Sequence, residues 1–466
     1  MRNLRAMESF FNPASVAVIG ASDRKNTIGY TIFQNLRRAH KRAFPVNPNR
    51  LSVQGVKAYA SVNGVPGNVD LAVIAVPALA VPQALAECMQ RGVKAAIIVS
   101  AGFSETGEKR LTQKIAALIR EFPQTLVIGP NCVGVVDRST GIDTTFFMKS
   151  RMKSPKKGSL AFISQSGALG SMAMDWIATQ EFGISKFVSY GNAMDVDEAD
   201  LLEYLGSDRK TKVITAYLEG AKNGRKFYDI AAKVCRKKPI VVLKGGKSEQ
   251  TRKATASHTG SLAGSSRVYD AAFRQSGIIE ADDLLDLFSM AKILEEEPLP
   301  KGDRVQIITN GGGFGIVMAD QILAQGMRLA RLSARTEKSL REQMPKATIS
   351  NPLDLLGDAD VHRYRVAIEA TLADSNVDIL VVLALFNLPT LQEKSLSILE
   401  KARKKAKKPV IVISIGSDYT QGYLEKIEKA GFTTFSYPGA AARAIRGISQ
   451  YARYLAKGRP GRQPAR

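Results

Sequence analysis

The sequence of 466 residues has little of what metal sites and membrane spans require, with only three cysteines and three histidines. Cys88, Cys132 and Cys235 are scattered and follow no metal-ligand spacing, which argues against a metal site and fits a reducing cytoplasm. No run approaches the ~18 apolar residues of a membrane span. Met1–Phe11 has charges but no apolar segment typical of a secretory signal. These absences predict a cytoplasmic globular protein.

Acidic residues are outnumbered, with 43 Asp and Glu against 66 Lys and Arg, giving a formal net charge of +23. Such a charge suits nucleic acid, an acidic protein or a polyanionic small ligand. Nucleic-acid binding usually adds a recognisable module or stacking aromatics. Here there is one tryptophan, the basic residues are spread out, and the densest run, Lys401–Lys408, is typical of a solvated helix end. The charge therefore favours phosphorylated ligands, without a nucleic-acid partner.

Short apolar runs alternate with amphipathic segments of helix length, the pattern of parallel sheets with crossover helices. At ~100–200 residues per domain, the length predicts about three domains. Basic or Pro/Gly-rich stretches at Arg151–Gly158 and Pro298–Gly302 mark two boundaries. We therefore expect domains at 1–150, 151–297 and 298–457, each doubly wound, and a disordered tail at 458–466. The expected strands are Ser15–Ile19, Ala43–Val46, Leu71–Val76, Ala95–Ser100, Thr125–Ile128, Ser159–Ser164, Lys186–Tyr190, Lys212–Leu218, Pro239–Leu243 and Arg304–Thr309.

Ligands of open α/β sheets bind beyond the carboxyl ends of the strands, so the loops after these strands are candidate sites. The first loop, Gly20–Gly29, lacks the G-x-G-x-x-G spacing of dinucleotide binding. The second strand ends in Asn47-Pro48-Asn49 rather than in the acid that would hold a ribose. Helix-start amides, with Lys25 nearby, would still bind a phosphate. The alternative is a glycine turn that only connects the first strand to the following helix and binds nothing.

The segment Leu243–Ser248, L-K-G-G-K-S, resembles the end of a Walker A loop. The leading glycine of that motif is missing, because Val241 occupies its place inside an expected strand. Without it the loop cannot wrap phosphates, so we reject ATP binding at this position.

Three features of the second domain suggest chemistry. Ser166 and Gly167 follow a strand at a helix start, where amides attract anions, although a plain serine N-cap is the alternative. Glu219 ends an apolar strand, and its carboxylate could fix an imidazole tautomer, unless it is an exposed strand-end glutamate. His258 lies in Thr255–Gly264, T-A-S-H-T-G-S-L-A-G, whose small residues predict a loop able to carry the imidazole to a buried target. The alternative is a surface histidine in a turn.

Together these residues carry a resemblance over essentially the whole chain. The chain resembles the α subunit of the NDP-forming acyl-CoA synthetases, a family that includes ADP-forming acetate–CoA ligase and is related to succinyl-CoA synthetase. The segment around His258 is the most specific, because the family's phosphorylated histidine lies in that motif. The resemblance is strongest in Phe11–Gly20 (F-N-P-A-S-V-A-V-I-G), Ser100–Gly107 (S-A-G-F-S-E-T-G), Ile128–Gly134 (I-G-P-N-C-V-G), Phe162–Gly167 (F-I-S-Q-S-G) and Ser257–Gly264 (S-H-T-G-S-L-A-G).

The resemblance implies a Rossmann-like CoA-binding domain followed by two flavodoxin-like domains. It also implies the reaction of acyl-CoA, ADP and phosphate to acid, ATP and CoA, through an acyl phosphate and a phosphohistidine at His258 on a swinging loop. Glu219 would orient the imidazole, and the amides of Ser166 and Gly167 would bind phosphate. Asn131 and Cys132 would lie near the thioester, with Cys132 not acting as a nucleophile. The other CoA contacts implied are Gly20, Ala21, Ser22, Lys25, Asn47, Pro48, Val76, Pro77, Ala78, Ser100, Ala101 and Gly102.

The family's ADP site is an ATP-grasp domain, and the three α/β regions leave no length for one. The resemblance therefore implies a separate ATP-grasp β subunit that binds ADP or ATP and Mg²⁺, in an α2β2 assembly. Asn310–Gly315 and Asn351–Asp354 resemble family segments that would serve assembly or loop docking. A CoA-sensing module without turnover is the alternative function, although a sensor has no need of a phosphate acceptor. An NAD-dependent oxidoreductase is excluded by the missing ribose acid.

Overall fold

The computed structural model describes residues 4–39, 42–180, 183–251, 265–391, 403 and 406–458. His258 and its motif lie outside these ranges, as do residues 459–466 of the expected tail. The chain divides into two compact units, residues 1–280 and 281–466. None of the helices in the described ranges is both long and apolar enough to cross a bilayer.

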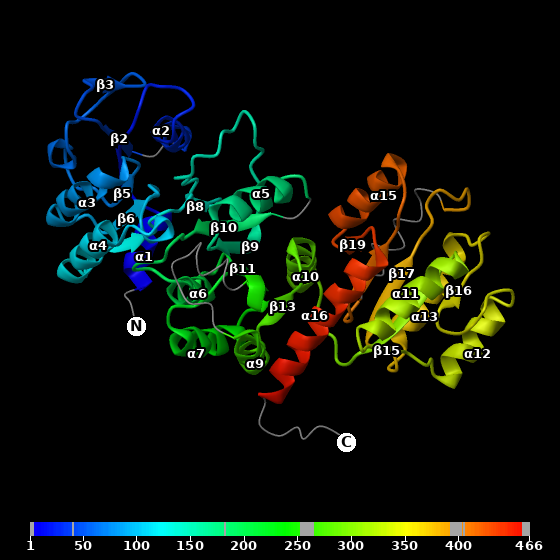
Figure 1. Ribbon diagram of the computed structural model, residues 1–466. Coiled ribbons are helices and arrows are strands. Elements are labelled where there is room, and N and C mark those ends of the chain that lie inside the picture. Colours follow the sequence, from blue (N-terminus) through cyan, green and yellow to red (C-terminus); the bar gives the residue numbers. More distant parts are fainter. Residues whose placement is uncertain are drawn as a thin grey trace. The chain divides into compact units, whose positions relative to one another are not determined.

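The first unit begins with a five-stranded parallel sheet in the order β2-β1-β5-β6-β7 (Figure 1). Every residue of β1 and β5 is buried, as continuous apolar runs in a sheet covered on both faces should be. Alternate strand residues pack with α3 and α4 in one hydrophobic core. The elements are α1 (Leu4–Phe11), β1 (Ser15–Ile19), α2 (Ile28–Arg38), β2 (Arg42–Val46), the hairpin β3 (Ser52–Val53) and β4 (Val56–Lys57), β5 (Leu71–Ile74), α3 (Val81–Gln90), β6 (Ala95–Ile98), α4 (Lys109–Glu121) and β7 (Leu126–Ile128).

A second, six-stranded sheet of the same unit has the order β13-β12-β11-β9-β10-β8. Its edge strand β8 is antiparallel to β10 and follows the first sheet directly in the chain. This edge was not expected from the sequence, because four residues carry little pattern. The elements are β8 (Gly134–Asp137), β9 (Lys157–Ser164), α5 (Gly167–Ile177), β10 (Ile184–Ser189), α6 (Glu198–Ser207), β11 (Val213–Leu218), α7 (Gly224–Cys235), β12 (Ile240–Lys244), α9 (Ser266–Ser276) and β13 (Ile279–Ala281).

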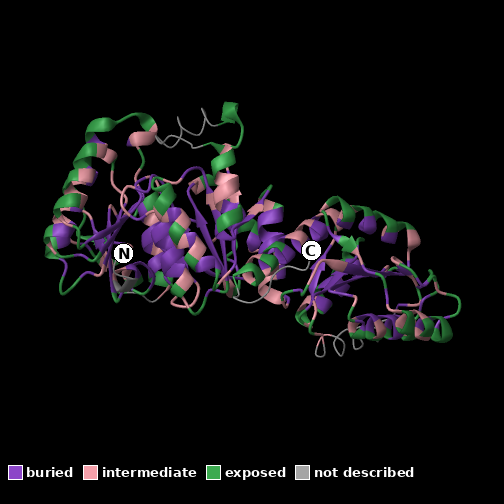
Figure 2. Ribbon diagram, turned by 90° about the horizontal axis from the view of Figure 1, so that it is seen from below, coloured by how far each residue is buried: buried purple, intermediate pink, exposed green. Residues whose placement is uncertain are grey.

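The second unit contains a parallel sheet in the order β15-β14-β17-β18-β19, with β16 pairing β14. One face packs against α12, α13 and α15, and the other against α10, α11 and α16. Figure 2 shows buried strands beneath helices whose outward sides are exposed. The elements are α10 (Leu284–Glu296), β14 (Arg304–Thr309), α11 (Gly312–Ala324), β15 (Arg328–Leu329), α12 (Ala334–Gln343), β16 (Leu353–Asp354), α13 (Val361–Ala373), β17 (Ile379–Leu383), β18 (Val410–Ile413), α15 (Asp418–Lys429), β19 (Thr433–Phe435) and α16 (Pro438–Lys457). The predicted succession of doubly wound α/β sheets is confirmed.

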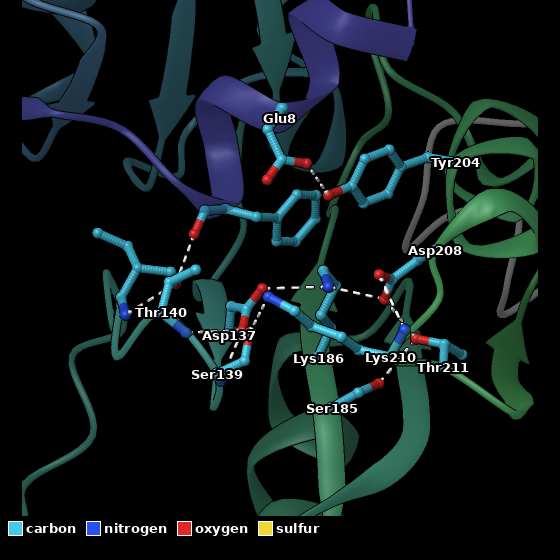
Figure 3. Close-up of polar contacts among 12 residues, drawn as sticks. Glu8, Asp137, Ser139, Thr140, Ser185, Lys186, Tyr204, Asp208, Lys210 and Thr211 are labelled. Atoms are coloured by element: carbon cyan, nitrogen blue, oxygen red, sulfur yellow. Dashed lines mark hydrogen bonds and ion pairs between the residues drawn. The ribbon is translucent and has the colours of Figure 1, made fainter.

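A buried ion-pair cluster joins the start of the chain to the second sheet (Figure 3). The Lys186 ammonium on β10 lies 2.7 Å from Asp208 Oδ2 and 3.1 Å from Asp137 Oδ2 on β8. Burial alone would raise the pKa of Asp208, but hydrogen bonds from Lys186 and Thr211 outweigh burial and lower it. The cluster therefore holds the edge strand β8 to β10 and to the end of α6 by a charge pairing that burial makes costly to break.

Beside this cluster, α1 packs onto α6. The Tyr204 hydroxyl donates to Glu8 at 2.7 Å, and the rings of Tyr204 and Phe11 stack at 4.8 Å (Figure 3). These contacts join the N-terminal helix of the chain to a helix that packs on the second sheet.

Candidate active site

The carboxyl ends of the two sheets in the first unit enclose a cavity of about 430 Å³. Of the residues proposed from the sequence, the cavity is lined by Ser100, Ala101, Asn131, Cys132, Ser166, Gly167 and Glu219. The strand-end rule thus brings residues from four loops to one space.

The other CoA-contact candidates do not line this cavity but follow strands of the first sheet. Gly20 follows β1 with φ +93°, and a Cβ there would lie 2.3 Å from the Ala75 carbonyl oxygen. The Asn47 amide donates to the Ala21 carbonyl at 2.9 Å, which joins the loops after β1 and β2. The exposed Lys25 lies in the first of these loops. The rest of this group is Ser22 after β1, Pro48 after β2, Val76, Pro77 and Ala78 after β5, and Gly102 after β6.

Asn131 is held between the two sheets. Its backbone N–H donates to the Ser100 carbonyl at 2.9 Å, and its side-chain amide donates to Asn192 Oδ1 at 3.3 Å. The Asn192 amide donates in turn to Glu105 Oε2 at 2.6 Å. Burial would raise the pKa of Glu105, but hydrogen bonds from Asn192 and from loop amides lower it, so this carboxylate is a fixed acceptor. Sequence reasoning missed Asn192, although it follows β10 and the strand-end rule could have found it.

Cys132 is buried in the cavity wall, and its thiol donates to the Ile98 carbonyl at 3.3 Å. Burial raises the pKa of this thiol to about 12. A thiol is a poor nucleophile unless it ionises, which supports the prediction that Cys132 is not a nucleophile.

The N-terminus of α5 opens onto the cavity through Ser166, Gly167 and Ala168. The Ser166 hydroxyl accepts from the Leu169 N–H at 3.3 Å, so it acts as the N-cap. Capping occupies the hydroxyl, but it leaves the helix dipole directed at the cavity, where a negative charge is stabilised. The N-cap alternative and the anion-site prediction are therefore compatible.

Glu219 is 7% exposed, which rules out the alternative of an exposed strand-end glutamate. The Gln165 side-chain oxygen accepts from the backbone N–H of Glu219 at 2.8 Å and from that of Gly220 at 3.2 Å. The Tyr217 hydroxyl shares a hydrogen bond with the Glu219 carboxylate, which contributes after burial to raising the tyrosine pKa to about 12. The backbone and the carboxylate of Glu219 are therefore both held at the edge of the cavity.

Lys244, from the rejected Walker-like segment, supports the same strand end. Its ammonium donates to the Glu219 carbonyl at 2.7 Å and lies 4.8 Å from the centre of the Tyr269 ring. Burial lowers its pKa to about 8. The following Gly245 has no room for a side chain, because a Cβ would lie 2.6 Å from the Tyr217 hydroxyl. This segment therefore has a structural role.

Three family models match successive stretches of the chain. They are a CoA binding domain at residues 14–138, a succinyl-CoA ligase like flavodoxin domain at 157–294 and a ligase-CoA domain at 305–457. With the cavity between the first two sheets, these matches define a CoA ligase of the succinyl-CoA ligase type.

Individual relatives narrow this class. The chain is 41% identical to subunit alpha of acetate–CoA ligase (ADP-forming) II from Pyrococcus furiosus, over 97% of this chain and 99% of that one. It is also 39% identical to acetate–CoA ligase (ADP-forming) I of Archaeoglobus fulgidus, but spans only 65% of that longer protein. The chain belongs to the ADP-forming acetate–CoA ligase family.

A solved structure of similar fold is the dinucleotide forming acetyl-coenzyme A synthetase 1 of Ca. Korarchaeum cryptofilum in complex with phosphate and ADP. It superposes with a TM-score of 0.90, at 35% identity, over 99% of this chain and 100% of that one. Among the described residues of our chain, no group of three or more His, Cys, Asp or Glu side chains could hold a metal ion.

Proposed function

We propose that this chain is the α subunit of an ADP-forming acyl-CoA synthetase, which interconverts acyl-CoA, ADP and phosphate with acid, ATP and CoA. The observation that carries the proposal is the cavity that joins Asn131 and Cys132 of the CoA-binding sheet to the α5 N-terminus and Glu219. One space thus offers a thioester position, an anion position and a carboxylate.

CoA would lie along the loops after β1, β2, β5 and β6, with its thioester at Asn131. The close approach of the backbone at Gly20 and Gly29 supports this, because a Cβ on Gly29 would lie 1.9 Å from the Gly20 carbonyl oxygen. Loop and helix here meet backbone to backbone, and such junctions leave amides open to phosphate groups. The contacts proposed from the sequence follow from this placement.

The first chemical step takes place at the α5 N-terminus. An oxygen of inorganic phosphate attacks the thioester carbonyl carbon, the carbon–sulfur bond breaks, and CoA leaves as the thiol after taking a proton. The helix dipole and the amides of Ser166 and Gly167 stabilise the phosphate charge. The acyl phosphate remains in the cavity.

In the second step, a neutral nitrogen of His258 attacks the phosphorus, the phosphorus–oxygen bond to the acyl group breaks, and the carboxylic acid leaves. Glu219 orients the imidazole by accepting a hydrogen bond from its other nitrogen. The supports from Gln165 and Lys244 keep Glu219 in place for this role. Phosphoryl transfer relies mainly on such positioning and on electrostatic stabilisation.

The third step transfers the phosphoryl group to ADP on a partner. We place ADP, ATP and Mg²⁺ on an ATP-grasp β subunit, and we propose an α2β2 assembly in the cytoplasm, without a membrane or nucleic-acid partner. The 65% coverage of the longer Archaeoglobus fulgidus relative supports a separate partner. We retain domains at 1–150, 151–297 and 298–457 as the working division.

The test uses the complex with its β partner and follows phosphate on this chain. With Mg²⁺ and labelled ATP, wild type should acquire an acid-labile, base-stable phosphate, and His258→Asn should acquire none. Acetyl-CoA with labelled inorganic phosphate should label the same residue from the opposite direction. Labelling that persists in the variant would contradict the mechanism. A chain that binds CoA but never takes up phosphate would instead be the sensing module.

A further inference from the structure

Phe146 is an aromatic residue that lines the active-site cavity and has no part in the mechanism described so far. It lies in the segment 142–147, which follows β8. Every other residue of this segment is buried, whereas Phe146 is partly exposed. An apolar ring that is left partly uncovered in the wall of a binding cavity is available to contact a ligand.

The backbone on both sides of Phe146 is fixed by buried hydrogen bonds. The side-chain amide of Asn35, a buried residue of α2, donates to the Thr145 carbonyl at 2.9 Å and to the Phe147 carbonyl at 3.1 Å. The Asp143 carboxylate accepts from the backbone N–H of Thr145 at 3.1 Å and from its hydroxyl at 2.6 Å. Because breaking these bonds would leave buried polar groups unsatisfied, the segment holds Phe146 in one place.

The ring of Phe146 also rests on a row of aromatic side chains. Its centre lies 6.3 Å from that of Phe147, edge to face, and Phe147 in turn lies 6.0 Å from Phe187 of β10. Phe187 is fully buried and lies 5.7 Å from Phe162 of β9. Since protein interiors are close-packed, this row leaves the Phe146 ring little room to withdraw from the cavity.

The other apolar residues of the cavity wall set its size less firmly. Val99, Cys132 and Val133 are each at most 5% exposed, so a ligand can touch little of them. Ile28, the first residue of α2, is 46% exposed and has room to turn into solvent. Among the described residues that line the cavity, none is Lys or Arg, so nothing there would pair with a second carboxylate on an acyl chain. The cavity therefore sorts neutral acyl chains by size, and Phe146 is its fixed apolar limit.

We propose that Phe146 determines acyl specificity, by limiting the size of the acyl group that can lie beside Asn131. The inference rests on the proposed function, which places the thioester at Asn131 in the same cavity. About 430 Å³ must hold the end of CoA, a phosphate and the His258 imidazole as well as the acyl group. A ring that cannot withdraw leaves room for an acetyl group but excludes branched and aryl chains.

The experiment compares Phe146→Ala with wild type in the complex with the β subunit. The measured quantity is kcat/KM for acetyl-CoA and for phenylacetyl-CoA, from the phosphate-dependent release of CoA with ADP and Mg²⁺. The readout is the ratio of the phenylacetyl-CoA value to the acetyl-CoA value within each protein, which cancels any difference in the amount of active enzyme. Wild type should favour acetyl-CoA by at least about tenfold, and the variant should raise the ratio by about 10–100-fold, the range in which apolar pockets discriminate by size. An unchanged ratio would overturn the inference, as would a wild type that turns over both substrates equally well.

Two further variants guard the result. Met172→Ala removes an apolar side chain of α5 that is 67% exposed and does not line the cavity, so its ratio should equal that of wild type. If its ratio rises as that of Phe146→Ala does, selectivity responds to any loss of apolar side chain in this unit and the inference fails. Should Phe146→Ala not fold, Phe146→Leu keeps an apolar but smaller side chain, and a smaller rise in the same direction is expected. Wild type that releases CoA from neither substrate and takes up no phosphate from labelled ATP would instead overturn the proposed function, so the two failures are distinguishable.

Discussion

The first unit contains a set of carboxyl groups that is paired with a cation and a buried carboxyl group that is not. Asp137 and Asp208 are paired with Lys186, and this pairing lowers the pKa of Asp208. Glu198 is buried more fully than Asp208 and has no side-chain hydrogen-bond partner within the described ranges, and burial raises its pKa to about 7. The paired cluster includes Asp137 on β8 and lies beside α1, whereas Glu198 lies in the first turn of α6. A buried charge that is paired holds the fold, whereas one that is left unpaired can change its protonation.

Breaking the paired cluster should produce the largest effect. Lys186→Met leaves two carboxylates buried without their cation, which typically costs about 3–5 kcal/mol of the free energy of unfolding. The only tryptophan, Trp176, belongs to the first unit, so denaturant unfolding followed by its fluorescence reports this unit. The loss should persist down to about pH 4 and shrink only at lower pH, because the pairing lowers the pKa of Asp208 from 3.8 and contributes stability until the pH falls through that lowered value.

The matched control for this prediction is Lys210→Met. Lys210 is exposed, and its ammonium donates to the Ser139 hydroxyl of the same cluster at 2.7 Å (Figure 3). Its removal should have little effect on unfolding, because the exposed ammonium returns to water in any case. An equal loss in both variants would mean that cluster packing, rather than buried charge, stabilises the fold.

Removing the Glu198 carboxyl group should change the free energy of unfolding in the opposite direction. The pKa of Glu198 is about 7 in the folded chain, against 4.5 for the free side chain. Between these pH values the folded chain therefore binds a proton that the unfolded chain has lost. The stability of wild type relative to Glu198→Gln should therefore fall as pH rises from about 4.5 to 7 and then level off. At pH 8 the variant should be more stable by up to about 3 kcal/mol, and at pH 4 by almost nothing.

The same unfolding assay measures this difference, with Glu203→Gln as the paired control on α6. Glu203 is held by Lys233, so its replacement should give no gain at high pH. A Glu198→Gln variant that is less stable than wild type at pH 8 but not at pH 4 would show that Glu198 stabilises the fold as an ion.

The contrast between the two clusters could not be predicted from the sequence. Apolar runs located the strands closely, and the strand-end rule brought Ser100, Asn131 and Glu219 to one cavity, although their catalytic roles stay predictions. Lys186 lies in the middle of the strand sequence I-S-K-F-V, where nothing local indicates that its cation is buried. Its partners come from β8 and from the turn after α6, which lie far from it in the sequence.

Glu198 was missed for a related reason. An acidic residue after Asp197 at a helix start is the usual complement to a helix dipole, so its type predicts an exposed position. The charges that act on it come from Asp197 beside it and from Lys222 and Lys226, which follow the next strand, β11. Pattern and spacing describe single elements, whereas burial of a charge depends on several elements meeting. The phosphohistidine motif was found from resemblance, and its residues lie outside the described ranges.

The smallest expected effect concerns Gln165, a buried neutral side chain at the cavity. It is neither part of an ion pair, like Lys186, nor able to ionise, like Glu198. Gln165 accepts hydrogen bonds from the N–H groups of Glu219 and Gly220, so Gln165→Met leaves two buried donors unsatisfied. We expect a loss of about 1–2 kcal/mol in the free energy of unfolding, independent of pH because no charge changes. Phosphate uptake should fall about tenfold, because Glu219 loses the support of its backbone. A pH-dependent loss in this variant would mean that the substitution changes the protonation of a neighbouring group and does not act through the two lost hydrogen bonds alone.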